Sequence, residues 1–453
     1  MRHFLCLIPV AALWVSPSFA ADVSFKNEIA PILAARCAGC HGGAEAKAGY
    51  RVNSFTAMLS PGETESDPLT AGDPDASYLL ELIESDDADA RMPKEAEALP
   101  AEQRALIRRW IEEGAKFDGP DAKAALQSYL PQVTHAAPPE AYRFALPITA
   151  VAISPNGQEV AASGYHEITI WNAADGKLLR RIPNVAERTL GLAYSADGAM
   201  LAAAGGAPGV SGELRVYNPA DGALVREVGR FADTAFAVTF NPDGTKLAVS
   251  GADRAIRVYQ VADWSEATTI EDHADWVTAI AFSPDGARIA SGSRDKTSKL
   301  FDVATGDALA TYPNYGDAVY GVAFSADGAQ VIAGGRAGRM DFWNAADGVR
   351  AAEVAVGGEI QRILAAGGQI FTVASDSHAR QFKADDRAAV RTYAGHSDRL
   401  QSAAFDPAAN RLVTGSINGE VRVWNTADGT QVTSFIAAPG FVTETAQVQA
   451  AAK

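Results

Sequence analysis

Apolar and polar residues alternate in short runs through residues 147–436. Ile168–Trp171 reads Ile-Thr-Ile-Trp, and Val421–Trp424 reads Val-Arg-Val-Trp. Because successive side chains of a strand point to opposite faces, this alternation predicts β-strands with one buried face. Clusters of Pro, Asp and Gly separate the runs and predict tight turns between them. The stretch is therefore expected to be all-β.

A turn phrase recurs in this stretch and sets its period. Variants of Phe-Ser-Pro-Asp-Gly end at Gly157, Gly198, Gly244, Gly286 and Gly328. The spacings between these glycines are 41, 46, 42 and 42 residues. A further variant, Phe405–Ala409, follows about two periods later, so a degenerate repeat is expected near Gly367 and Gly368. An aromatic residue also ends one strand of each repeat: Trp171, Tyr217, Tyr259, Phe301, Trp343, Phe382 and Trp424.

Seven repeats of this length, each with room for four short strands, predict a seven-bladed β-propeller over residues 147–436. A single blade leaves both of its faces uncovered, so the blades must stack into a closed ring. The strand that closes the ring is either Thr430–Ile436, from the last repeat, or Tyr142–Leu146, from before the first. Residues 437–453 are expected to form a C-terminal tail.

Residues 22–118 show a helical period instead. Ser24 is a candidate N-cap for a helix whose apolar residues recur at helical spacing, and Pro31 predicts a late start or a kink. A last helix is expected over Ala101–Glu113, with Gly114 as its stop signal. These patterns predict a small all-α domain.

The two regions are preceded by one distinct segment and joined by another. Residues 1–20 combine a basic start with the apolar run Leu5–Val15 and small residues before Ala20. This pattern predicts a cleaved secretory signal and an exported, periplasmic protein. The apolar run is too short to span a bilayer comfortably, so no membrane span is expected. Residues 119–146 carry several prolines and are expected to be a semi-stiff linker.

Charge narrows the choice of partners. The formal net charge is −16, which argues against nucleic-acid binding, because that function needs clustered Lys and Arg. An acidic run lies ahead of Met92: Glu84, Asp86, Asp87 and Asp89. This run is either a solvated loop or a docking site for a basic redox partner.

The sharpest chemical signal is Cys37–His41, which reads Cys-Ala-Gly-Cys-His. This is the attachment signature of a c-type haem. Cys37 and Cys40 can each form a thioether to the porphyrin, and His41 is placed to bind the iron as the proximal ligand. A zinc site or a redox disulfide is the alternative. After loss of Cys6 with the signal, however, Cys37 and Cys40 are the only cysteines left in the sequence, too few for a four-sulfur zinc site. No βαβ pattern surrounds the motif, as a thioredoxin-like redox disulfide would require.

Two methionines compete for the sixth position on the iron. Met92 precedes Pro93 in an expected loop ahead of the last helix, whereas Met58 lies in an apolar turn and suits a core. A thioether is a soft ligand that raises the potential of haem iron. Met92 is therefore predicted to be the distal ligand, with Met58 as the alternative.

Residues 26–118 resemble the cytochrome-c-like domain that is abundant in planctomycetes. The matching pieces are Cys37–Gly42, Gly72–Leu79, Arg91–Pro93 and Leu99–Ala115. The resemblance implies one covalent haem c with His41 and Met92 as iron ligands, in a small all-α class I-like cytochrome c domain. Lys94 stands where that family often has a second proline.

The repeats resemble WD40 repeats, most closely at residues 273–302. The resemblance implies a structural hydrogen-bond network of His273, Ser291, Asp295 and Phe301, where Phe301 lacks the indole donor of the usual Trp. The last repeat offers a second set: His396, Thr414 and Trp424, with Asn418 near the acidic position. These histidines are thus expected to be structural rather than ligands. No Ser-His-Asp set, phosphate loop or metal-spaced carboxylate cluster stands out in the repeats.

Together these features predict an exported monohaem electron carrier rather than a catalyst. The propeller is expected to be a docking scaffold for another protein, and the haem to serve a redox partner protein. One alternative is a two-cofactor oxidoreductase with a second cofactor in the propeller. Another is a haem-based redox or gas sensor, which would have a labile or missing sixth ligand.

Overall fold

The computed structural model describes residues 22–41, 46–64, 66–94, 97–123, 126–129, 133–313 and 315–441. The predicted signal segment 1–20 and residues 442–453 of the predicted tail lie outside the described residues. The chain divides into two compact units, with the boundary between residues 130 and 131.

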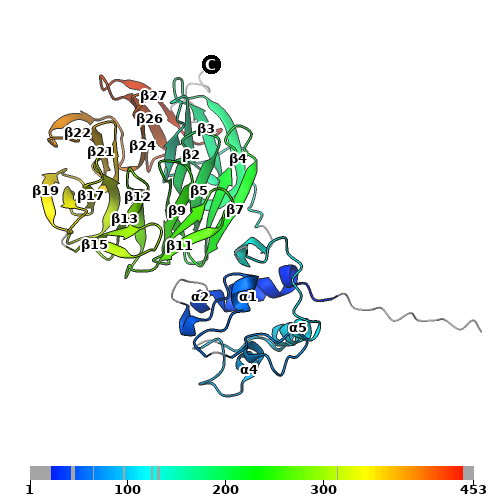
Figure 1. Ribbon diagram of the computed structural model, residues 1–453. Coiled ribbons are helices and arrows are strands. Elements are labelled where there is room, and N and C mark those ends of the chain that lie inside the picture. The colour runs from blue at the N-terminus through cyan, green and yellow to red at the C-terminus, as the bar shows by residue number, and fades with distance from the viewer. Residues whose placement is uncertain are drawn as a thin grey trace, which may run out of the picture. The chain divides into compact units, whose positions relative to one another are not determined.

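The first unit is helical (Figure 1). Its helical segments are the π-helical turn η1 (Phe25–Ile29), α1 (Ala30–Arg36), α2 (Ala38–His41), η2 (Lys47–Gly49), α3 (Phe55–Met58), α4 (Tyr78–Glu84), α5 (Ala101–Glu112) and η3 (Leu126–Tyr129). The expected small helical region is confirmed.

The first helix begins where the sequence predicts. The Ser24 hydroxyl accepts a hydrogen bond from the Asn27 backbone N–H at 3.0 Å, as an N-cap does. A π-helical turn precedes α1, so Pro31 falls in the first turn of α1, where its missing N–H is not needed. The last helix, α5, ends one residue earlier than expected, and Gly114 follows with φ 99°.

The first and last helices meet in an aromatic core. Phe25 and Trp110 are fully buried, with ring centroids 5.6 Å apart. Phe55 packs edge-on against Phe25 at 4.9 Å, and Phe117 lies 4.8 Å from Phe55. Burying rings of this size accounts for much of the stability of so small a unit. This core joins segments from both ends of the unit and so holds α1 in place.

The predicted linker, residues 119–146, does not run free at either end. Leu126 and Tyr129 are buried in the core of the first unit, and the Leu126 N–H donates to Asn53 O at 2.9 Å. Residues 133–142, in contrast, belong to the second unit and bond to its strands. The Tyr142 hydroxyl donates to Glu167 Oε1 at 2.5 Å, and Arg215 Nη2 donates to Val133 O at 2.7 Å.

The second unit is a β-propeller of antiparallel sheets (Figure 1). Five sheets have four strands each. They are β8–β11 (Ala235–Phe240, Lys246–Gly251, Ile256–Gln260, Glu266–Ile270), β12–β15 (Val277–Phe282, Arg288–Ser293, Ser298–Asp302, Ala308–Tyr312), β16–β19 (Val319–Phe324, Gln330–Gly335, Arg339–Asn344, Arg350–Ala355), β20–β23 (Ile360–Ala366, Gln369–Ala374, Ala379–Lys383, Ala389–Tyr393) and β24–β27 (Leu400–Asp406, Arg411–Ser416, Glu420–Asn425, Gln431–Ile436).

The sixth sheet has seven strands. They are β1 (Val151–Ile153), β2 (Glu159–Ser163), β3 (Tyr165–Asn172), β4 (Leu178–Tyr194), β5 (Leu201–Ala207), β6 (Ser211–Tyr217) and β7 (Leu224–Phe231). The prediction of seven four-stranded blades is therefore wrong, since five such blades are present. The reason is β4, which pairs with β3 along its first part and with β5 along its second, without a loop between them.

The turn phrase has a clear physical role. In its second copy the Ser195 hydroxyl donates to Asp197 Oδ1 at 2.6 Å, and the Ala199 N–H donates to the same oxygen at 3.0 Å. These bonds lower the pKa of Asp197 and fix the turn. Gly198 then adopts φ 71°, which a residue with a side chain reaches only with strain. The phrase is thus a β-turn code, as expected.

The last sheet takes all four of its strands from the C-terminal end of the chain. Of the two candidates for the closing strand, the last repeat is confirmed, because β27 (Gln431–Ile436) is the fourth strand of this sheet. Residues 142–146 form no strand. At the seam to β1, apolar side chains of the first and last sheets pack in one core, and single hydrogen bonds such as Ser402 Oγ to Ile148 O at 2.7 Å cross it.

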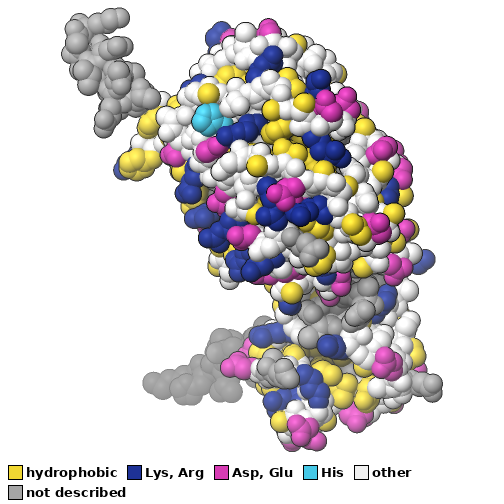
Figure 2. Space-filling view, turned by 90° about the vertical axis from the view of Figure 1, so that its left-hand side faces the viewer, with side chains coloured by type: hydrophobic (Ala, Val, Ile, Leu, Met, Phe, Trp, Pro, Cys, Tyr) yellow, Lys and Arg dark blue, Asp and Glu magenta, His cyan; other side chains and the backbone are white. Residues whose placement is uncertain are grey.

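The surface carries both signs of charge. On the face shown in Figure 2, Lys and Arg side chains are interspersed with Asp and Glu side chains. The net negative charge thus does not gather into one acidic patch on that face. Among the described residues, no helix is long and apolar enough to cross a membrane.

Candidate functional site

The turn between α1 and α2 positions the cysteine–histidine motif. The Cys37 N–H donates to Leu33 O at 2.9 Å, and the His41 N–H donates to Cys37 O at 3.0 Å. This helical hydrogen bonding continues from the buried helix α1 and sets the direction of His41. Cys37 is half-buried. Cys40 lies within α2, but its side chain is outside the described residues.

A cavity of about 660 Å³ lies in the first unit and brings three predicted site residues together. Cys37, His41 and Met92 all line it. Its apolar wall comes from Val52, Leu79, Leu82, Ile83 and Leu99. Four basic or acidic side chains also reach it: Arg36, Lys47, Asp89 and Lys94.

A backbone carbonyl fixes the imidazole of His41. His41 Nδ1 lies 3.0 Å from Tyr50 O. A carbonyl only accepts, so Nδ1 carries the hydrogen and Nε2 keeps its lone pair for a metal. Tyr50 is itself held, because its hydroxyl donates to Met58 O at 3.1 Å. Burial raises the pKa of Tyr50, so its hydroxyl stays protonated and able to donate.

The two candidate methionines occupy different places. Met58 ends α3 and is fully buried in the core, and it is not among the residues that line the cavity. Met92 lines the cavity, and its N–H donates to Leu82 O at 3.0 Å. Met92 at the cavity and Met58 in the core are placed as the sequence predicts. The role of Met92 as an iron ligand stays a prediction.

The residues around the cavity fit a haem. The cavity volume lies within the range of about 300–1,000 Å³ that is usual for ligand and cofactor pockets. A haem needs an apolar enclosure and one or two donors to iron, and the wall supplies aliphatic side chains, an imidazole nitrogen and a thioether. Cys37, the first cysteine of the motif that would attach it, lines this space.

The acidic run before Met92 is partly structural. Arg108 donates hydrogen bonds to both carboxylate oxygens of Glu84, from Nε at 3.2 Å and from Nη2 at 2.6 Å. Asp87 Oδ1 accepts the Asp89 N–H at 2.9 Å and so shapes the loop. Glu84 therefore ties α4 to α5, a role that the sequence did not reveal.

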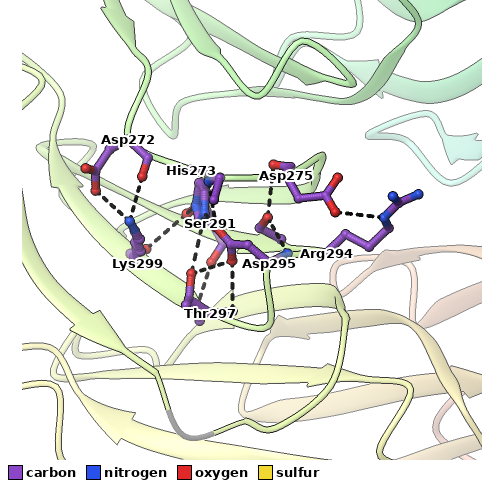
Figure 3. Close-up of polar contacts among 12 residues, drawn as sticks. Asp272, His273, Asp275, Ser291, Arg294, Asp295, Thr297 and Lys299 are labelled. Carbon is purple, nitrogen blue, oxygen red and sulfur yellow. Dashed lines mark hydrogen bonds and ion pairs between the residues drawn. The ribbon is translucent and has the colours of Figure 1, made fainter. Parts of the chain in front are cut away.

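The predicted hydrogen-bond network of His273 is present in the sheet β12–β15 (Figure 3). His273 Nδ1 lies 2.7 Å from Asp295 Oδ2, and Nε2 lies 2.6 Å from Ser291 Oγ. Hydrogen bonds from His273 and Thr297 lower the pKa of Asp295 against the opposing effect of burial. The Phe301 ring packs edge-on against His273, with centroids 6.1 Å apart. His273 is thus structural.

The second network forms with one correction. His396 Nε2 lies 2.7 Å from Thr414 Oγ1, which also accepts the Trp424 indole N–H at 2.9 Å. The acidic partner is Glu420, whose Oε2 lies 3.0 Å from His396 Nδ1. The expected Asn418 instead donates to Ser397 Oγ at 2.8 Å. The longer Glu side chain reaches the histidine from two residues further along the chain.

Sequence analysis missed a set of buried charges in the seven-stranded sheet. Arg215 is fully buried and lies 3.2 Å from Glu213 and 3.4 Å from Glu227. His135, from the segment before the propeller, lies 2.8 Å from Glu213. No local signal could have found them, because Glu213 and Arg215 occupy the polar positions of an alternating strand, Ser211–Tyr217, and only the fold buries that face.

Two family models match the chain. The model described as Planctomycete cytochrome C matches residues 37–96. The model described as WD domain, G-beta repeat matches residues 229–260, 264–302, 306–344 and 387–425. A search of curated proteins found no match.

Proposed function

Because the chain joins a planctomycete cytochrome c domain to WD40 repeats, we propose that it is an exported electron-transfer protein with a protein-docking propeller. The observation that carries the proposal is the cavity that gathers Cys37, His41 and Met92 in one apolar enclosure. A cytochrome domain favours electron transfer, and a WD40 propeller favours binding of another protein.

The first unit would hold one haem c. Cys37 and Cys40 would attach it by thioethers, and His41 and Met92 would be its iron ligands. Bound haem would supply a one-electron iron couple. The Tyr50 carbonyl orients the His41 ring and fixes its tautomer. The aliphatic part of the cavity wall would lower the polarity around a bound haem, which together with a thioether ligand favours a raised potential.

The predicted signal segment supports a periplasmic location, where haem attachment to such a motif takes place. The redox partner and the docked partner are both proteins in this proposal. Neither nucleic acid nor a membrane span is part of it.

An absorption spectrum of the full chain, expressed with export and haem attachment, tests the proposal. Met92→Leu is expected to abolish the Met–iron absorption band and to lower the potential by on the order of 0.1 V or more. Met58→Leu is the matched control. It leaves the ligand in place, so the band is expected to persist even if stability falls.

The outcomes separate the possibilities clearly. One iron per chain and covalent haem retained after acid–acetone extraction support the proposal. A band that survives Met92→Leu contradicts the ligand assignment, and more than one haem per chain contradicts the single-haem carrier. For the propeller, crosslinking in the periplasm should capture a protein partner, and a chain that remains wholly uncrosslinked speaks against a docking role.

A further inference from the structure

The innermost strands of the propeller form a ring. β1 lies beside β4, β4 beside β8, and the order continues through β12, β16, β20 and β24 back to β1. In five of these strands the pairing register shifts at the same place, just before a small residue. We call these five residues, with the equivalent residue of β20, the central layer: Gly191, Ala237, Ala279, Gly321, Arg362 and Ser402.

Arg362 is the exception in the central layer. It occupies the position in β20 where the other strands carry Gly, Ala or Ser. Its Nη2 donates to Leu190 O at 3.4 Å, and Leu190 lies on β4. Going round the ring from β20 to β4, one passes β24 and β1. The side chain of Arg362 therefore extends across the middle of the ring.

The positive charge of Arg362 has no counter-charge among the described residues. Its recorded hydrogen bonds go to two backbone carbonyls, Leu190 O at 3.4 Å and Gln361 O at 2.9 Å. Burial disfavours the charged form and lowers the pKa of the guanidinium, and no carboxylate offsets that effect. An arginine does not lose its proton in a protein, so the charge stays. Arg362 is half-buried, so water still reaches part of the side chain, but a partly desolvated charge gains from a partner because leaving it unpaired is costly.

We propose that Arg362 is the binding residue of an anion site at the middle of the propeller, which takes a carboxylate or a small oxyanion. A guanidinium carries five N–H donors in a planar fork that matches carboxylate and phosphate oxygens. Two are used by the carbonyls, which fix the fork and leave donors for a ligand. The site is independent of the haem.

The ligand has two possible sources, a free anion or an acidic side chain of a docked protein. Isothermal titration calorimetry on the full haem-loaded chain separates them. The probes are inorganic phosphate, acetate and an acetylated, amidated Ala-Glu-Ala peptide, with Ala-Gln-Ala as the uncharged match. Heat with phosphate or acetate indicates a free anion. Heat with the Glu peptide alone indicates an acidic side chain of a partner.

Arg362→Gln keeps much of the length and removes the charge, and we expect it to weaken binding at least tenfold. Arg362→Lys keeps the charge without the fork and should weaken binding less. Arg336→Gln, at an exposed arginine just after β17, is the control and should bind as the wild type does. Thermal unfolding checks the fold, and Arg362→Gln should be no less stable than the wild type without anion. Equal affinity in wild type and Arg362→Gln overturns the proposal, as does the absence of binding tighter than about 1 mM for every probe.

Discussion

The seven-stranded sheet and the sheet β12–β15 both bury charged groups, but they assemble them differently. In β12–β15, His273 and Asp295 are 22 residues apart and meet within one repeat. In the seven-stranded sheet, Arg215 bonds to Val133, which is 82 residues away and precedes the propeller. The His273 network lies within one repeat, so it can recur wherever that repeat is duplicated. The Arg215 network depends on a segment outside the repeats. The two sheets should therefore fail in different ways when they are mutated.

The largest effect is expected from Arg215→Ala. Among the described residues, the substitution leaves Glu213 with only His135, and Glu227 with only Arg230, as a partner, and breaking a buried group of charges costs about 3–5 kcal/mol of unfolding free energy. Chemical denaturation of the full chain measures the loss. Lys177→Ala is the control in the same sheet, because the Lys177 side chain is 80% exposed and pairs with Asp175 in water. A loss below about 1 kcal/mol for Arg215→Ala would show that water replaces the cation.

A smaller effect is expected from His273→Ala in the regular sheet. It removes the partner of Ser291 and Asp295 at once, and unsatisfied buried groups of this kind cost about 2–3 kcal/mol. The loss is measured by the same denaturation experiment. His378→Ala is the matched control, because that side chain is 39% exposed and should change stability by less than about 0.5 kcal/mol. Equal losses in the two variants would contradict a structural role for the network.

The smallest effect is a pH dependence in the last sheet. Burial, and after it the charge of Arg422, lower the pKa of His396 to about 3. Glu420 pairs with Arg422 at 2.8 Å and makes no hydrogen bond to His396 Nδ1, although the two atoms lie 3.0 Å apart, so it does not hold the imidazolium. The folded pKa lies below the unfolded value of about 6.5. Stability is therefore full above pH 6.5 and declines as the pH falls toward 3.

Between pH 6.5 and pH 5 this decline should amount to roughly 1–2 kcal/mol for the wild type. His396→Asn, which does not titrate, should lack that part of the decline. Denaturation curves for both proteins at the two pH values measure the difference. An identical decline in both proteins would mean that His396 takes up its proton equally well when folded.

The parts of the structure that could be predicted are those encoded by neighbouring residues. Ser24 caps its helix, the turn phrase forms its turn, and His273 finds Ser291 and Asp295 as expected. Each of these depends on spacing within one helix, turn or repeat. The cavity with Cys37, His41 and Met92 also agrees with the sequence, because the motif and the loop are held by the same packed helices.

The parts that could not be predicted depend on contacts between residues distant in the sequence, or on a strand that continues where a turn was expected. Nothing in β4 (Leu178–Tyr194) marks its failure to turn between two repeats, so the count of separate blades was wrong. Glu420 rather than Asn418 approaches His396, because side-chain reach and not sequence position decides the contact. The pairing of Arg215 with the segment at Val133 needs the folded ring before it can be seen.

The seam between the last sheet and β1 has a mechanical consequence. No described strand from the start of the propeller pairs with a strand of the last sheet. The hydrogen bonds between the two ends are single ones, such as Ile148 N to Ser416 O at 3.0 Å. At every other junction between neighbouring sheets the chain runs directly from one sheet into the next, whereas no such covalent connection crosses this seam. A force applied to the two ends of the propeller would therefore part this seam first, with every sheet still intact. The ring therefore has one defined opening point, which lies where the first and last sheets of the propeller meet.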